Sequence, residues 1–100
     1  MKLPADIDAQ IEKQFGPAAA QVRTLFEAHD GAFPEAARVA RCVLFLAKQD
    51  VARVSSLLDS ARADYRDVIF WAEYTDHAAD RPKHVRDFGK SFELLPPKRR

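Results

Sequence analysis

A chain of 100 residues is long enough for one domain, which at this size can bury about two-thirds of its unfolded surface. Its 47% hydrophobic and 31% charged residues are typical of a folded protein and argue against global disorder. The formal net charge of +1 excludes a strong overall attraction to nucleic acid, to an anionic membrane or to an acidic partner.

The first residues predict a cytoplasmic location. MKLPADIDAQIEK has no apolar stretch of the kind found in a secretory signal. The longest apolar run, Cys42 to Ala47, is far shorter than the roughly 18 residues of a membrane span. Cys42 has no other cysteine to pair with, so we expect a buried, reduced thiol that fills space in the core.

Two short helices are predicted before residue 31. The first follows Pro4, which suits a first turn, and ends at Gly16. Its apolar residues recur every four positions and are expected to face the core; they are Ile7, Ile11 and Phe15. The second starts at Pro17, ends at Asp30 and Gly31, and places apolar residues on one face, namely Ala18, Val22, Leu25 and Phe26.

The segment 34–48, PEAARVARCVLFLAK, is predicted to be the central helix of the fold. Its middle has no polar side chain, so it needs cover on nearly every side. Arg38, Arg41 and Lys48 are interpreted as its solvent-facing side. The connector that follows is short, so this helix and the next are expected to form an antiparallel hairpin.

Residues 51–75 form either one helix or two. Asp50 is a good N-cap, and the apolar spacing permits a single helix of about 25 residues. However, Asp64 followed by Asp67 resembles a capping box, which favours a new helix at Asp64. With two helices here, the fold is all-α with about five short helices.

After Thr75 the sequence becomes more basic and less suited to helix formation. Residues 76–100 hold seven Lys and Arg against four Asp and Glu, and four breakers prevent a long helix: Pro82, Gly89, Pro96 and Pro97. We expect one domain over residues 1–95, including an irregular basic C-terminal arm from about residue 76, and a disordered tail over 96–100. Four residues are expected to pack this arm onto the helices: Val85, Phe88, Phe92 and Leu94.

Two stretches, RCVLFLAKQD and ARADYRDVIFWAEY, resemble those of short, uncharacterised bacterial proteins that share a helical hairpin followed by an aromatic-rich helix. The resemblance spans Arg41 to Tyr74, about a third of the chain. It implies a helical, bacterial, cytoplasmic protein, and it brings no activity, ligand or catalytic residue.

The leading functional hypothesis is a protein–protein interaction or regulatory module that self-associates. Segments 34–48 and 64–75 are apolar over more than one face, and a small domain has few elements to cover both. Aromatic residues often anchor protein interfaces, and the candidates are Tyr65, Phe70, Trp71 and Tyr74. The opposing interpretation is that the remaining elements cover both helices.

A second hypothesis places a ligand, metal or catalytic site between helix 64–75 and the arm. Its candidate residues are Glu73, His77, His84 and Arg86, because imidazole and carboxylate groups can bind metal ions. Their spacing lacks the HExxH or paired ExxH patterns that fix ligands, and a solvated charged loop explains them more simply. No metal or other cofactor is therefore expected.

Nucleic-acid binding through the basic arm is a third hypothesis. The basic residues begin at Arg62 and Arg66 and continue through the arm to Arg100, but aspartates are interleaved among them and cancel much of their field. No nucleophile motif or glycine-rich phosphate loop is present. The sequence thus gives no support for an enzyme.

Overall fold

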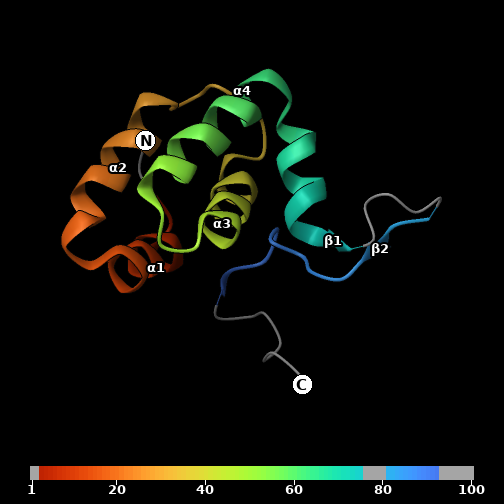
Figure 1. Cartoon of the computed structure of the whole chain (residues 1–100), viewed down its shortest axis with the longest axis horizontal. Helices are drawn as coiled ribbons and strands as arrows, with labels where there is room; N and C mark the ends of the chain where they lie inside the picture. Colours follow the sequence, from red (N-terminus) through yellow and green to blue (C-terminus); the bar gives the residue numbers. More distant parts are fainter. Residues whose placement is uncertain (1–2, 76–80, 93–100) are drawn as a thin grey trace.

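The computed structural model describes residues 3–75 and 81–92 (Figure 1). Over these residues the chain is mostly helical, as predicted, but it contains four α-helices instead of about five. The elements are α1 (Ala5–Phe15), a 3₁₀ turn η1 (Gly16–Ala18), α2 (Ala19–Ala28), α3 (Ala36–Ala47), α4 (Val51–Glu73), and the two short strands β1 (Tyr74–Thr75) and β2 (Lys83–His84).

The first two helices form where the apolar spacing predicts them. Ile7, Ile11 and Phe15 of α1 are buried, which confirms the predicted stripe. Gly16 ends α1 with a φ of 49°, a left-handed value that favours glycine. The chain then turns through η1 directly into α2, which buries Val22 and Phe26 against the same core.

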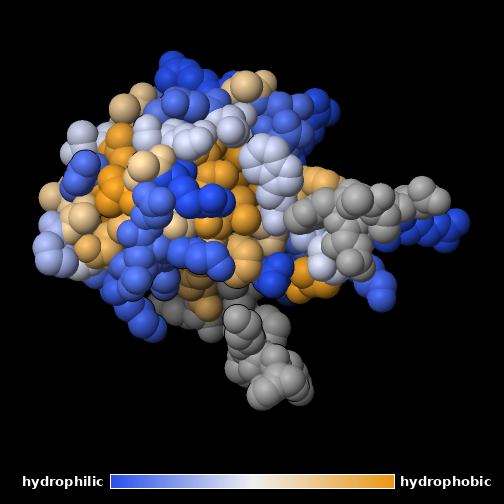
Figure 2. All heavy atoms as spheres, in the orientation of Figure 1, coloured by the Kyte–Doolittle hydropathy of each residue, from blue (hydrophilic) through white to orange (hydrophobic). Residues whose placement is uncertain are grey.

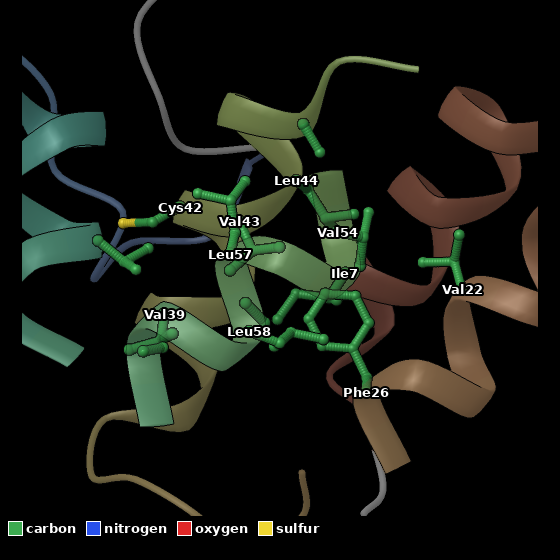
Figure 3. Packing of buried hydrophobic residues seen from close by; sticks show 14 of the residues in the cluster. Ile7, Val22, Phe26, Val39, Cys42, Val43, Leu44, Val54, Leu57 and Leu58 are labelled. Carbon is green, nitrogen blue, oxygen red and sulfur yellow. The ribbon is translucent and has the colours of Figure 1, made fainter. Parts of the chain in front are cut away.

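Helix α3 lies in the middle of the core. It begins at Ala36, two residues after the predicted start at Pro34, because Glu35 adopts a left-handed backbone with a φ of 53°. Figure 3 shows side chains of all four helices pointing toward one another, among them Ile7, Phe26, Leu44 and Leu58. The apolar run is not covered throughout, since Phe45 remains 40% exposed.

Helix α4 consists of two helical stretches that are joined by a sharp kink and form one bent element over residues 51–73. Asp50 accepts hydrogen bonds from the backbone N–H groups of Ala52 and Arg53, as expected of an N-cap. At Asp64 the backbone leaves the helical region (φ −159°, ψ 102°), and the last turns point in a new direction (Figure 1). The predicted break at Asp64 is confirmed, but the two stretches form one bent element, so the fold has four helices rather than five.

The described part of the C-terminal segment, residues 81–92, is called the arm below. It is not wholly irregular, because β2 pairs antiparallel with β1, with Tyr74 opposite His84. Phe88 is buried and Phe92 packs against the core, as expected, but Val85 is 49% exposed, contrary to the prediction. Leu94, the start of the arm near residue 76 and the tail 96–100 lie outside the described residues.

Within residues 3–75 and 81–92, no helix combines the length and the apolar character needed to cross a membrane.

Candidate functional site: a buried carboxylate and the surface around it

Glu73, at the end of α4, is a completely buried acid that joins three segments. Its carboxylate accepts two hydrogen bonds from Arg38 of α3, from Nε at 2.8 Å and from Nη2 at 2.6 Å. Two further partners come from the arm: His84 Nε2 at 2.8 Å and the backbone N–H of Phe88 at 3.0 Å. The residue therefore ties α3 and the arm to the end of α4.

The backbone of the same residue also holds the arm. The carbonyl oxygen of Glu73 accepts hydrogen bonds from the N–H groups of Val85, at 2.7 Å, and Arg86, at 3.1 Å. One residue thus supplies both main-chain and side-chain acceptors to the start of the arm.

The hydrogen bonds decide the charge of this buried acid. Burial by itself acts to raise the pKa of Glu73, because a charged carboxylate loses its hydration. The donors from Arg38, His84 and Phe88 outweigh that effect, so the pKa lies below its usual range. Glu73 is therefore an anion, and the same pair raises the pKa of the Arg38 guanidinium.

Cys42 lies next to this network. Its sulfur is completely buried and 3.8 Å from Glu73 Oε2, and Figure 3 shows the side chain pointing away from Leu44 and Ile7, toward the last turns of α4. Burial, together with the negative charge of Glu73, raises the pKa of the Cys42 thiol. The residue is an unreactive core thiol, as the sequence predicts.

A second buried ion pair fixes the far end of the arm. Arg41 of α3 donates to Asp6 of α1 at 2.8 Å and 3.1 Å, and to the carbonyl oxygen of Phe88 at 3.0 Å. Asp6 also accepts the backbone N–H of Phe92 at 3.0 Å. The hydrogen bond from Arg41 lowers the pKa of Asp6 despite its burial.

This pair corrects the interpretation of Arg38 and Arg41 as a solvent-facing side of α3. Arg41 is only 7% exposed, because its guanidinium is matched by a carboxylate and a carbonyl group. Arg38 is partly buried on Glu73. Both arginines thus serve as internal anchors for elements that lie far away in the sequence.

The predicted ligand-binding residues are brought together only in part. Glu73 and His84 are in contact, as described above. The guanidinium of Arg86 contacts other groups than the Glu73 carboxylate. Its Nη1 donates to the carbonyl oxygen of Ala72 at 3.2 Å, and its Cζ lies 4.4 Å from the ring centre of Phe45. His77 lies outside the described residues.

The geometry around Glu73 fits an anchor better than a catalytic or metal site. Its carboxylate is inaccessible to solvent and already has donors on both oxygens. In the part of the chain that the structure describes, no group of three or more His, Cys, Asp and Glu side chains is arranged to hold a metal ion. Its hydrogen-bonding capacity is used to hold the fold together.

Each of the three segments that meet at this anchor exposes one large hydrophobic side chain. Three large hydrophobic side chains are exposed among the described residues: Phe45 of α3 at 40%, Trp71 of α4 at 39% and Val85 of the arm at 49%. Arg86 connects their segments, since it stacks on Phe45 and bonds to the residue that follows Trp71. We call Phe45, Trp71, Val85 and Arg86 the junction surface.

The four predicted interface residues do not share one environment. Trp71 belongs to the junction surface, whereas Tyr65, Phe70 and Tyr74 are partly buried. These three line an open groove of about 680 Å³ between the start of α3 and the last turns of α4. Tyr74 also lies against His84, with ring centres 4.7 Å apart. The four aromatic residues thus differ in exposure and in their neighbours.

Arg66, part of the predicted basic run, lies in the same groove. Its guanidinium forms two hydrogen bonds of 3.0 Å with Asp64. This pairing supports the view that acids within the sequence offset the basic residues on α4.

No family model, curated protein or solved structure matches the chain. The resemblance to short bacterial helical proteins therefore stays a prediction.

Proposed function

We propose that the protein is a small interaction module that forms a homodimer through the junction surface. The single observation that supports this proposal most is the exposure of Trp71, a side chain that is otherwise costly to leave in water. Tryptophan is also among the residues that most often dominate the binding energy of protein interfaces.

The arm gives this surface a defined shape. Glu73 fixes Val85 and Arg86 through their backbone N–H groups, and Arg86 in turn lies over Phe45. Residues from three segments are thus held in place before any partner arrives. Such preorganisation reduces the entropy that binding would otherwise cost. In the view of Figure 2, hydrophobic atoms are visible between hydrophilic ones over the region of α3 and α4.

A second copy suits this surface better than a strongly charged partner. In a twofold dimer each patch meets its own copy, and apolar side chains such as Phe45, Trp71 and Val85 are complementary to themselves. The formal net charge of +1 also produces little repulsion between two copies.

The test is a comparison of the native chain with Trp71→Ala by light scattering over a range of concentrations. We expect the native mass to rise above 11.3 kDa as the concentration increases. The substitution should weaken dimerisation at least about tenfold, because a hot-spot aromatic contributes more than 1.4 kcal/mol. It should cost less stability than the roughly 3–5 kcal/mol of a core tryptophan.

Tyr65→Ala is the matched control, because it removes an aromatic ring from the groove side of the same helix. Its dimerisation should equal that of the native chain. A mass that stays at 11.3 kDa at every concentration, or equal weakening by both substitutions, would contradict the proposal.

A further inference from the structure

We infer that the groove between α3 and α4 binds the segment 93–100 of the same chain, ELLPPKRR. This segment lies outside the described residues, so the inference is based on the groove, on the segment's chemistry and on the position at which the described chain stops. It does not require the proposed dimer.

The lining of the groove suits an extended, proline-containing segment. Tyr65, Phe70 and Tyr74 provide aromatic surface along the last turns of α4. Aromatic-lined grooves bind proline-rich segments because these are already extended, so little conformational entropy is lost on binding. The segment carries consecutive prolines, Pro96 and Pro97.

The charges of the groove and of the segment are complementary. Three carboxylates line the groove, those of Glu35, Asp64 and Asp67. Two guanidiniums also line it: Arg38, which pairs with Glu35 at 3.2 Å as well as with the buried Glu73, and Arg66, which pairs with Asp64. The lining therefore carries a net of one negative charge, contributed by Asp67.

Lys98, Arg99 and Arg100 follow the prolines directly, with Glu93 as the one acid of the segment. Complementary charges of this kind fix the direction in which a segment binds and discriminate against acidic competitors.

The described chain stops close enough for its own continuation to reach the groove. Phe92 is fixed to Asp6, and Asp6 is paired with Arg41. Arg41 is three residues beyond Arg38, a rise of about 4.5 Å along α3, and Arg38 lines the groove. Eight extended residues span about 26 Å. A tether this short gives an effective concentration on the order of millimolar, which favours the same chain over a second copy.

A spin label tests this inference on the full chain. A cysteine added after Arg100 can be labelled selectively, because the native Cys42 is completely buried. We expect a nitroxide at this position to cause the loss of amide NMR signals of Tyr65, Asp67 and Phe70, relative to the same sample with the label reduced. The loss should persist on dilution, since the contact is within one molecule.

Two charge reversals show whether the groove is responsible. Asp67 is exposed and lines the groove, so Asp67→Lys should restore the lost signals. Glu27→Lys makes the same change on the exposed surface of α2 and should leave the loss unchanged. Measuring the unfolding free energy of both variants confirms that they are folded.

A mixed sample distinguishes the source of the segment. Spin-labelled chains without ¹⁵N are combined with unlabelled ¹⁵N chains, and no loss of groove signals is expected. A loss in this sample would assign the groove to a second copy and overturn the inference. It would also be overturned if the native chain showed no loss, or if Asp67→Lys left the loss intact. All three measurements are made at a concentration at which light scattering gives the mass of the monomer, so that contacts across the proposed dimer do not contribute.

Discussion

Glu73 shows how much of the structure one side chain can hold. It connects α3 and the arm to α4, and all of its partners except Cys42 are conventional nitrogen donors. Glutamine at this position would keep the shape, but its NH₂ group would face donors such as His84 Nε2 and the Phe88 N–H. At least one buried group would then lose its partner.

We therefore expect Glu73→Gln to lower the free energy of unfolding by about 2–4 kcal/mol. Hydrogen exchange should also show loss of protection at the Phe88 amide, while the Val54 amide in the core of α4 keeps more of its protection. Glu27→Gln removes the same charge from an exposed site and should change stability by no more than about 0.5 kcal/mol. Equal stabilities for the two variants would argue against Glu73 as an anchor.

The two buried acids also predict how stability depends on pH. The folded-state pKa values of Glu73 and Asp6 are both lowered, so the unfolded chain binds more protons in acid. Their contribution is complete above the unfolded pKa values of about 4.3 and 3.9, and it is lost as the pH falls through the lower folded values. Urea unfolding at a series of pH values should thus show stability decreasing below about pH 4.

Glu73→Gln provides the control for this pH dependence, because it removes one of the two acids. Its stability should decrease less steeply in acid than that of the native chain. A native chain whose stability is constant from neutral pH to strong acid would show that these ion pairs contribute nothing.

At the scale of elements, the kink in α4 determines which surfaces are formed. The carboxylate of Asp64 accepts the backbone N–H of Arg66 at 3.1 Å, so it caps the second part of the helix without ending the element. The capping box expected with Asp67 is not formed, because among the described residues the Asp64 N–H donates no hydrogen bond to the Asp67 carboxylate. After the kink, Phe70 and Tyr74 line the groove beside the start of α3, and the Tyr74 ring also lies against His84 of the arm.

Two matched substitutions test this cap. Asp64→Ala should lower the free energy of unfolding by about 1 kcal/mol, which is typical of a lost N-cap. Asp67→Ala removes an acid three residues later and should have almost no effect in the same denaturation experiment. If both substitutions cost the same, the capping box would be the better description.

The local features of this fold could be predicted from sequence, whereas its long-range contacts could not. Gly16, Asp50 and the stripe from Ile7 to Phe15 act on residues within one or two turns, so their patterns indicate helices directly. The partners of Glu73 and Arg41 lie on other elements, and charge alone does not identify them. The sequence offered one indication of these contacts, which is the position of Arg41 beside an apolar run. A charged side chain there is expected to be buried and therefore to need a buried partner.

The candidate site was predictable to a similar extent. Glu73 and His84 were identified by their residue types, and Trp71 by its place in an aromatic helix. The exposure of Val85 and Phe45 could not be predicted, because it depends on the path of the arm. That path is set by Glu73 and Asp6, whose partners are distant in sequence.

At the scale of the whole molecule, these anchors and the kink together leave one tryptophan exposed beside the arm. Since the anchors fix the arm from within, a binding partner has no need to order it. The proposed dimer therefore requires little rearrangement of either copy, and most of its binding energy should come from burying the junction surface.

Because Trp71 is the only tryptophan of the chain, its fluorescence reports directly on this surface. The central claim is tested by recording the emission maximum and iodide quenching of the native protein over a wide range of concentrations. We expect the emission to move to shorter wavelength and the quenching to decrease as the mass rises toward that of a dimer. An emission maximum and quenching that stay constant while the dimer forms would show that Trp71 remains in water, and would contradict the account.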